Sequence, residues 1–162
     1  MVPRGYDGAK KVKGRKRHIV NDTQGLVLGC YVGPADENDR QGIIPALEEA
    51  KSKYPSLSKA RADMGYQSNK LKDYIQHKYG IELEVVKRPP SSFWIHKDTP
   101  IDQIAVREPG FKVQARRWVV ERTFAWINRN RRLAKEYDML LDSTESLIYL
   151  SLSRLMLRRE YV

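Results

Sequence analysis

One stretch of the sequence, residues 115–133, constrains the fold most strongly. It contains neither proline nor glycine, so it predicts one uninterrupted helix. Val120, Phe124 and Ile127 recur at helical spacing and predict the buried face of that helix. The stretch holds six arginines but a single carboxylate, Glu121, which follows Arg117 by one helical turn. The spacing alone favours an ordinary surface ion pair, and it leaves open a functional carboxylate in a cationic field that attracts a polyanion.

The overall composition favours a single domain that binds nucleic acid. The chain has 162 residues, 41% of them hydrophobic, and its net charge is +10 with a pI near 9.7. We therefore treat residues 1–162 as one domain and expect nucleic acid, rather than a membrane, as its partner. No segment is apolar over the length of a membrane span and no secretory signal follows Met1, so we expect a cytoplasmic protein. Cys30, the single cysteine, lies in an apolar run and predicts a buried thiol.

The N-terminal part of the sequence predicts a loop followed by a β-hairpin. Residues 1–14 are rich in glycine and predict a loop, which leads into a basic run over residues 10–17 with six Lys or Arg in eight positions. Such a run is either a solvated tail or an arm that contacts DNA phosphates. Residues 17–22 and 26–32 predict two strands joined by a turn that begins at Asp22. Asp22 then has a structural role, because its carboxylate accepts backbone hydrogen bonds in such a turn.

The middle of the chain alternates predicted helices with short strands. A helix is expected from Asp39, as its N-cap, to Lys53, although Pro45 favours a start a few residues later. A weak strand over 57–63, a helix over 69–79 and an alternating strand over 81–87 follow. Asp63 ends the weak strand just before a glycine turn, which is where open α/β sheets place ligand groups.

The last third of the chain begins with a long predicted loop over residues 89–112. The helix over 115–133 comes next, and Asp142 with Glu145 resembles a capping box that starts a final helix ending near Arg159. The order of elements predicts an α/β fold, a mixed sheet with flanking helices.

Four segments of the sequence resemble, in the same order, the bacterial insertion-sequence transposases of the DDE class, in the insertion sequence five family or a related insertion sequence four-like group. They are PRGYDGAKKVKGRKRHIVNDTQG, ARADMGYQ, RRWVVERTFAWINRNRRL and SLIYLSLSRLMLRR. The resemblance spans essentially the whole chain, and its third segment is the most specific. It implies a ribonuclease-H-like core that acts on DNA.

The resemblance also implies which residues do the chemistry. In this class two aspartates and one glutamate hold two Mg²⁺ ions about 4 Å apart. Asp63 matches the second aspartate, Glu121 the glutamate and Arg117 the arginine that precedes it. The first aspartate of the class lies on the central first strand, upstream of PRGYDG, so the resemblance implies an N-terminally truncated copy that lacks this strand and one metal ligand. Asp22 does not align with the first aspartate, although a neighbouring strand could bring it near the metal.

Arginine and lysine side chains are expected to hold the DNA backbone around this incomplete two-ion site. The candidates for DNA binding are Lys10, Lys11, Lys13, Arg15, Lys16, Arg17, Arg117, Arg122 and Arg129.

Three functions stay open at this stage. The resemblance implies a Mg²⁺-dependent transposase that cuts transposon ends and transfers strands, and we expect this chain alone to be marginally stable and without strand-transfer activity. The first alternative is a basic DNA-binding module without catalysis, and the second is a ribonuclease-H-like nuclease built from Asp22, Asp63 and Glu121. Besides DNA, the expected partner is a second copy of the chain or a fragment from an upstream reading frame.

Overall fold

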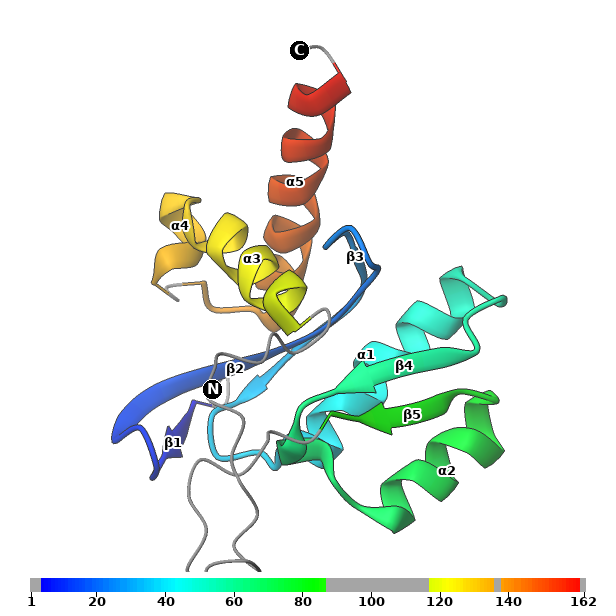
Figure 1. Cartoon of the computed structure of the whole chain (residues 1–162). Coiled ribbons are helices and arrows are strands. Elements are labelled where there is room, and N and C mark those ends of the chain that lie inside the picture. The colour runs from blue at the N-terminus through cyan, green and yellow to red at the C-terminus, as the bar shows by residue number, and fades with distance from the viewer. Residues whose placement is uncertain (1–3, 87–116, 136–137, 161–162) are drawn as a thin grey trace, which may run out of the picture.

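A long β-hairpin lies at the centre of the computed structural model, which describes residues 4–86, 117–135 and 138–160 (Figure 1). Strands β2 (Val12–Asn21) and β3 (Val27–Pro34) pair antiparallel, with His18 opposite Tyr31. A short strand, β1 (Gly5–Asp7), pairs with the start of β2 and completes a three-stranded sheet. In the hairpin turn the Asp22 carboxylate accepts hydrogen bonds from the backbone N–H groups of Gln24 and Leu26, each 2.8 Å long. The structural role predicted for Asp22 is therefore confirmed.

The loop predicted over residues 1–14 is wrong in part, because β1 occupies residues 5–7 and β2 already begins at Val12. Asp7 makes the tight connection possible: its carboxylate accepts hydrogen bonds from the backbone N–H groups of Ala9 and Lys10, at 3.0 and 3.1 Å. Lys11 in this turn has a φ of +54°. The basic run over residues 10–17 is thus a turn and the first half of a strand, rather than a tail.

Two helices and a second, smaller sheet pack on one face of the hairpin. They comprise α1 (Asp39–Lys53), β4 (Lys59–Ala62), the 3₁₀ helix η1 (Met64–Tyr66), α2 (Asn69–Tyr79) and β5 (Glu82–Val85). Strands β4 and β5 pair in parallel, and the core between them and the helices contains Ile43, Leu47, Ile75 and Leu83. The α/β class is confirmed, but the described strands form two sheets rather than one mixed sheet. Strands β2 and β4 therefore belong to different sheets.

Helix α1 begins where the sequence predicts, although its cap differs. Asn38 is the N-cap, with its side chain accepting a hydrogen bond of 3.0 Å from the Arg40 N–H, and Asp39 is the first helical residue. The prediction that Asp39 is the N-cap is therefore wrong by one position. Pro45 lies inside the helix and does not delay its start. Helix α2 ends as predicted, with Gly80 in the left-handed region at a φ of +65°.

The helix predicted over residues 115–133 is interrupted in its described part. Helix α3 (Arg117–Asn128) ends before Asn130, whose side chain accepts a hydrogen bond from Arg132 N–H and caps the short helix α4 (Arg131–Ala134). Asn130 has an extended backbone, which ends α3 without proline or glycine, and its side chain accepts a backbone N–H that has no acceptor within α4. The buried face is also shifted from the prediction, since Val120 is 36% exposed whereas Val119 is 3% exposed.

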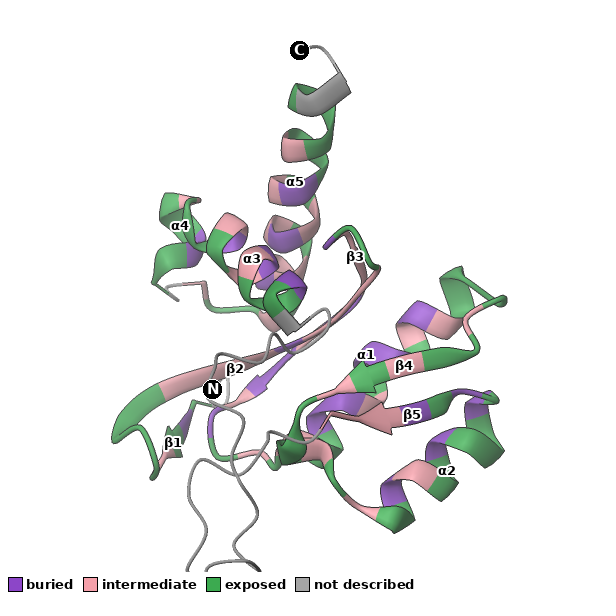
Figure 2. Cartoon of the chain, in the orientation of Figure 1, coloured by how far each residue is buried: buried purple, intermediate pink, exposed green. Residues whose placement is uncertain are grey.

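Helix α5 (Leu141–Glu160) covers the other face of the hairpin with the part of its length that ends near Leu155. Ile148 and Leu152 are buried beside Cys30 and Val32 of β3, which confirms the predicted burial of the Cys30 thiol. Met156 is 43% exposed, and the C-terminal end of α5 projects away from the rest of the molecule (Figures 1 and 2). Across the described residues, none of the helices combines the length and the apolar character that crossing a membrane requires.

Two carboxylates close the outer edge of β3. Glu49 of α1 accepts a hydrogen bond of 2.8 Å from Cys30 N–H and one of 2.7 Å from the Tyr149 hydroxyl. Glu145 of α5 accepts one of 2.8 Å from Val32 N–H, so the predicted capping box with Asp142 is wrong. An open strand edge invites pairing with other chains, and these side chains satisfy its donors instead. Burial raises the pKa of Glu145, although the hydrogen bond from Val32 opposes the rise.

We predict that Glu145→Ala lowers the free energy of unfolding by about 1–3 kcal/mol, because it leaves the N–H of the buried Val32 without an acceptor. Glu145→Gln should lower the free energy of unfolding clearly less. Its amide oxygen still accepts the hydrogen bond from Val32 N–H, and the carboxylate that burial disfavours is removed. Urea denaturation of both variants at neutral pH measures the difference. Equal losses in the two variants would contradict this role of Glu145.

Candidate functional site

Asp63 lies where the small sheet meets the hairpin. It follows the last residue of β4 and is the N-cap of η1, with its carboxylate accepting a hydrogen bond from Met64 N–H. The backbone N–H of Tyr66 donates to the Asp63 carbonyl at 3.0 Å and closes the turn. The side chain of Asp63 is exposed, as a carboxylate that binds a ligand must be.

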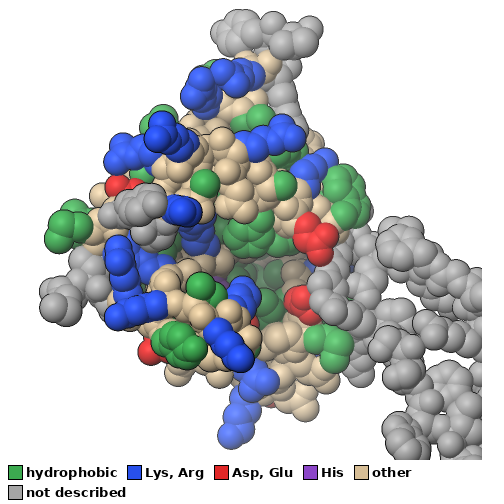
Figure 3. Space-filling model, turned by 90° about the vertical axis from the view of Figure 1, so that its left-hand side faces the viewer, with side chains coloured by type: hydrophobic (Ala, Val, Ile, Leu, Met, Phe, Trp, Pro, Cys, Tyr) green, Lys and Arg blue, Asp and Glu red, His purple; other side chains and the backbone are tan. Residues whose placement is uncertain are grey.

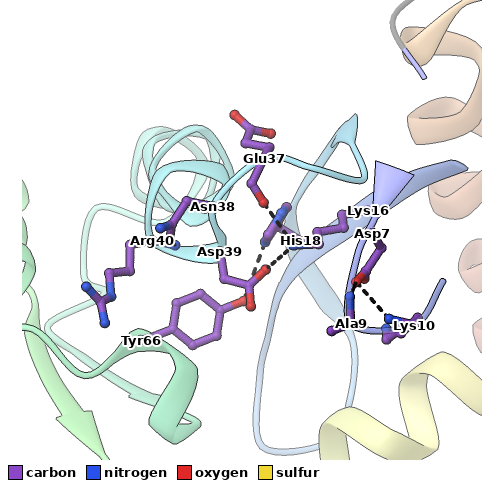
Figure 4. A network of polar contacts seen from close by, with 10 residues as sticks. All are labelled: Asp7, Ala9, Lys10, Lys16, His18, Glu37, Asn38, Asp39, Arg40 and Tyr66. Atoms are coloured by element: carbon purple, nitrogen blue, oxygen red, sulfur yellow. Dashed lines mark hydrogen bonds and ion pairs between the residues drawn. The ribbon is translucent and has the colours of Figure 1, made fainter. Parts of the chain in front are cut away.

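Polar side chains from β2 and from the start of α1 lie near Tyr66, which follows Asp63 by three residues (Figure 4). Nδ1 of His18 lies 3.4 Å from the hydroxyl of Tyr66, which joins β2 to η1. The Lys16 ammonium donates to Asp39 at 3.0 Å and to the Glu37 carbonyl at 2.9 Å, which joins β2 to the start of α1. Burial raises the pKa of Tyr66 to about 12, and the carboxylates of Asp39 and Asp63 add to the rise. Both carboxylates therefore act on the same phenol.

The sequence gives only faint signals for this polar cluster. Lys16 and His18 alternate along β2 and so share one face, which places them opposite α1. Tyr66 follows Asp63 by three residues and is brought inward by the short turn of η1. The pairing of Lys16 with Asp39 joins residues that are far apart in sequence, so no local pattern reveals it.

Glu121 is exposed on α3, which is attached to the turn of the hairpin.

The attachment of α3 fixes where Glu121 lies. The Thr123 hydroxyl is completely buried, 2.8 Å from the Gly25 carbonyl and 3.0 Å from the Val119 carbonyl. A Cβ on Gly25, where φ is +88°, would lie 2.8 Å from the Thr123 hydroxyl oxygen, so the hairpin tip and the helix touch directly. Glu121 precedes Thr123 by two residues on α3, so the bond from Thr123 to the hairpin turn fixes the position of Glu121. The side chain of Arg117, its expected ion-pair partner, lies outside the described side chains.

The described residues provide only some of the ligands that a metal ion would need. Asp63 and Glu121 are exposed carboxylates, which offer the oxygen ligands that Mg²⁺ prefers. Within residues 4–86, 117–135 and 138–160, no three His, Cys, Asp or Glu side chains are grouped closely enough to hold a metal ion. The long loop predicted over 89–112 lies outside the described residues.

A basic surface joins the hairpin to the helices after α3. Arg15 of β2 donates to the carbonyls of Asp138 and Met139, at 2.9 and 3.0 Å, and Arg132 of α4 forms an ion pair of 3.2 Å with the Asp138 carboxylate. Asp138 thus brings the basic half of β2 beside α4. Figure 3 shows the corresponding face, with Lys and Arg side chains in several clusters, hydrophobic side chains between them and few acids.

The described side chains that are expected to bind DNA differ in their exposure. Arg15, Lys16 and Arg122 make hydrogen bonds inside the protein, Arg122 to the Gln24 carbonyl at 2.6 Å. Arg17 is half-buried on β2. The exposed members, which are available to phosphates, are Lys10, Lys11, Lys13 and Arg129.

Comparison of the chain with known proteins identifies a matching family. A family model described as a transposase DDE domain matches residues 2–156. The chain is also similar to a putative transposase for insertion sequence element IS402 of Burkholderia cepacia, with 29% identity over 136 residues. The aligned region is 80% of this chain and 56% of that relative, so the chain spans little more than half the length of the relative. No solved structure matches the chain.

We predict that His18 makes stability depend on pH in the weakly acidic range. Burial lowers the pKa of His18 in the folded protein, with Asp39 opposing the effect, so the unfolded chain binds the proton more readily. The free energy of unfolding should therefore fall as the pH drops below the ordinary histidine pKa of about 6.5. Urea denaturation between pH 7.5 and 5.5 measures this slope. His18→Gln should flatten it, whereas His77→Gln on the exposed side of α2 should not.

Proposed function

Because the chain belongs to the transposase DDE domain family, we propose that it binds the DNA of transposon ends and contributes Asp63 and Glu121 to a Mg²⁺-dependent centre for DNA cleavage and strand transfer. The observation that carries this proposal is the family match over residues 2–156, a range that includes both carboxylates. Their exposure on two elements attached to one hairpin supports it.

The proposed centre needs a third carboxylate. Bound Mg²⁺ supplies a Lewis acid that activates the attacking oxygen and stabilises the leaving one. Asp63 and Glu121 would hold such ions, and we propose that an aspartate outside the described residues completes the set, on a central strand between β2 and β4. The separation of those two strands into different sheets is what a ribonuclease-H-like fold without this strand would show. We accordingly propose a transposase in the insertion sequence five or four-like group, whose described residues alone do not complete the metal centre.

A second function has one observation in its favour. A basic DNA-binding module without catalysis would need no three-ligand group, and the described residues contain none. Such a module would bind DNA equally well with or without Mg²⁺. A nuclease centre that includes Asp22 is less well supported, because the Asp22 carboxylate already accepts two backbone hydrogen bonds in the turn. In either case the proposed partner, besides DNA, is a second copy or an upstream fragment of the same transposase.

We predict that exposed lysines of the β1–β2 turn and of β2 contact DNA phosphates. The double variant Lys10→Gln, Lys13→Gln should weaken binding to any duplex and lower the slope of log K against log salt by about 0.9 for each lost contact. Binding titrations at several salt concentrations measure the slope. The matched control is Lys70→Gln, Lys72→Gln on α2, which removes the same charge and should leave the slope unchanged. Equal changes of the slope in the two double variants would show that only the net charge of the chain determines DNA binding.

A further inference from the structure

Exposed apolar side chains are concentrated on α5 and on the residues just before it. Among the described residues, five of the twelve large hydrophobic side chains that are exposed lie between positions 139 and 157. Leu150 is 65% exposed and Leu157 is 56% exposed, on the side of α5 opposite to the buried Ile148 and Leu152. The part of the helix that carries Leu157 projects beyond α3 and α4 (Figures 1 and 2). Such a concentration of exposed apolar side chains marks an interaction surface.

One row of side chains on α5 runs through Leu150 and changes its charge from end to end. The row, which we call the α5 ridge, consists of residues spaced by four, Asp142, Ser146, Leu150, Arg154 and Arg158. All five are exposed, the first is acidic and the last two are basic. The small side chain of Ser146 leaves room for another helix beside Leu150. The α5 ridge is therefore complementary to a copy of itself that runs in the opposite direction.

A hollow lies beside the acidic end of the α5 ridge. Its volume is about 410 Å³, and it is lined by Arg132, Asp138, Asp142, Ser143, Ser146 and Leu147. Arg132 already forms an ion pair with Asp138, which leaves the Asp142 carboxylate to attract a further cation. Met139 and Leu140, between Asp138 and the start of α5, are 78% and 63% exposed. This end of α5 thus suits a partner that is both basic and apolar, which is the character of its other end.

Charge also determines the direction in which two copies can pair. The whole chain carries a charge of +10, so most contacts between two copies bring like charges together. A parallel pairing of α5 would place Arg158 beside Arg158 of the second copy, and like charges in contact are unfavourable. An antiparallel pairing that crosses at Leu150 places Arg158 of each copy beside Asp142 of the other, because both lie eight residues from Leu150. It also brings the apolar C-terminal end of α5 toward the apolar residues before α5 in the other copy.

We propose that the α5 ridge binds the α5 ridge of a second copy, with the two helices antiparallel and Leu150 on the two-fold axis. Packing along rows of residues spaced by four is the commonest arrangement of two helices in globular proteins. The contact is isologous, so each copy contributes the same residues and the assembly closes as a dimer. The proposal goes beyond the proposed function, because it requires neither DNA nor a metal ion. It assigns the exposed face of α5 to a second copy rather than to an upstream fragment.

Charge exchange between two variants of the whole chain tests the pairing by sedimentation equilibrium. Asp142→Arg and Arg158→Asp each place like charges opposite each other twice in a pair of identical copies, so each variant should bind itself at least about tenfold more weakly than the wild type. An equimolar mixture of the two should recover the wild-type affinity, because both contacts then join opposite charges. Within one copy the two positions are about 24 Å apart along the helix, so the recovery cannot arise inside a chain. The matched controls on α2, Asp73→Arg and Lys70→Asp, should leave the association unchanged.

A cysteine on the two-fold axis gives a second measurement if the charge variants do not fold, which thermal unfolding shows. Leu150→Cys should form a disulfide between two copies when copper phenanthroline oxidises it, because a residue on the axis meets itself. Leu157→Cys should not, because its two copies are about 21 Å apart in this register. Cys30 is buried, so it should not react in either variant.

Three results would overturn the proposal. They are a wild-type chain that is monomeric at every concentration, a mixture of the charge variants that associates no better than either alone, and disulfides that form as readily from Leu157→Cys as from Leu150→Cys. Weaker DNA binding by Arg158→Asp without any change in association would assign the α5 ridge to DNA instead. A monomeric chain that binds DNA would leave the proposed function intact, whereas a dimer that binds no DNA would overturn the proposed function and leave the pairing.

Discussion

The alternation of side chains along the central hairpin determines the rest of the structure. His18, Val20, Gly29 and Tyr31 face α1 and the small sheet, whereas Ile19, Cys30 and Val32 face α3 and α5. A strand directs successive side chains to opposite faces, so one hairpin can serve two separate cores. Gly29 shows how closely α1 approaches, because a Cβ there would lie 2.1 Å from the Ala46 carbonyl. A shift of one residue in the hairpin register would exchange the two faces and disrupt both cores at once.

This arrangement attaches two carboxylates from distant parts of the sequence to the same hairpin. Asp63 is attached to one face of the hairpin through Tyr66 and His18, and Glu121 is attached to its tip through Thr123 and Gly25. Neither carboxylate belongs to the hairpin. The hairpin instead supplies the rigid frame, and its outer edge is closed by Glu49 and Glu145 rather than left open to another strand. Buried groups thus hold both exposed carboxylates in place, as the proposed site would require.

Local patterns in the sequence predict much of the fold. The hairpin, both ends of α2 and the position of β5 agree with the structure, because turn residues and alternation act over a few positions. The break at Asn130 and the role of Glu145 were not predictable in this way. Each depends on which hydrogen-bond partner a side chain finds, and for Glu145 that partner, Val32, is 113 residues away.

In the candidate site, too, the contacts between distant elements are the part that local sequence patterns do not predict. The sequence identifies Asp63 and Glu121 by resemblance to a family, because the residues around each do not distinguish it from a structural acid. The cluster of Lys16, His18, Asp39 and Tyr66 around Asp63 was missed, because it brings together three separate elements. Arg122 was expected to bind DNA, yet its guanidinium lies between two indoles and bonds to the hairpin, a role that appears only when the helix is docked.

The central claim is that the hairpin brings Asp63 and Glu121 to the same divalent ion. Fe²⁺ binds carboxylate oxygens in place of Mg²⁺, and with ascorbate and peroxide it generates radicals that cut the polypeptide beside the bound ion. The account predicts cuts near residues 63 and 121 together, both suppressed by excess Mg²⁺ and both lost in Asp63→Asn, with Asp73→Asn on α2 as the unaffected control. Cuts near only one of the two residues, or cuts near Glu121 that persist in Asp63→Asn, would contradict it.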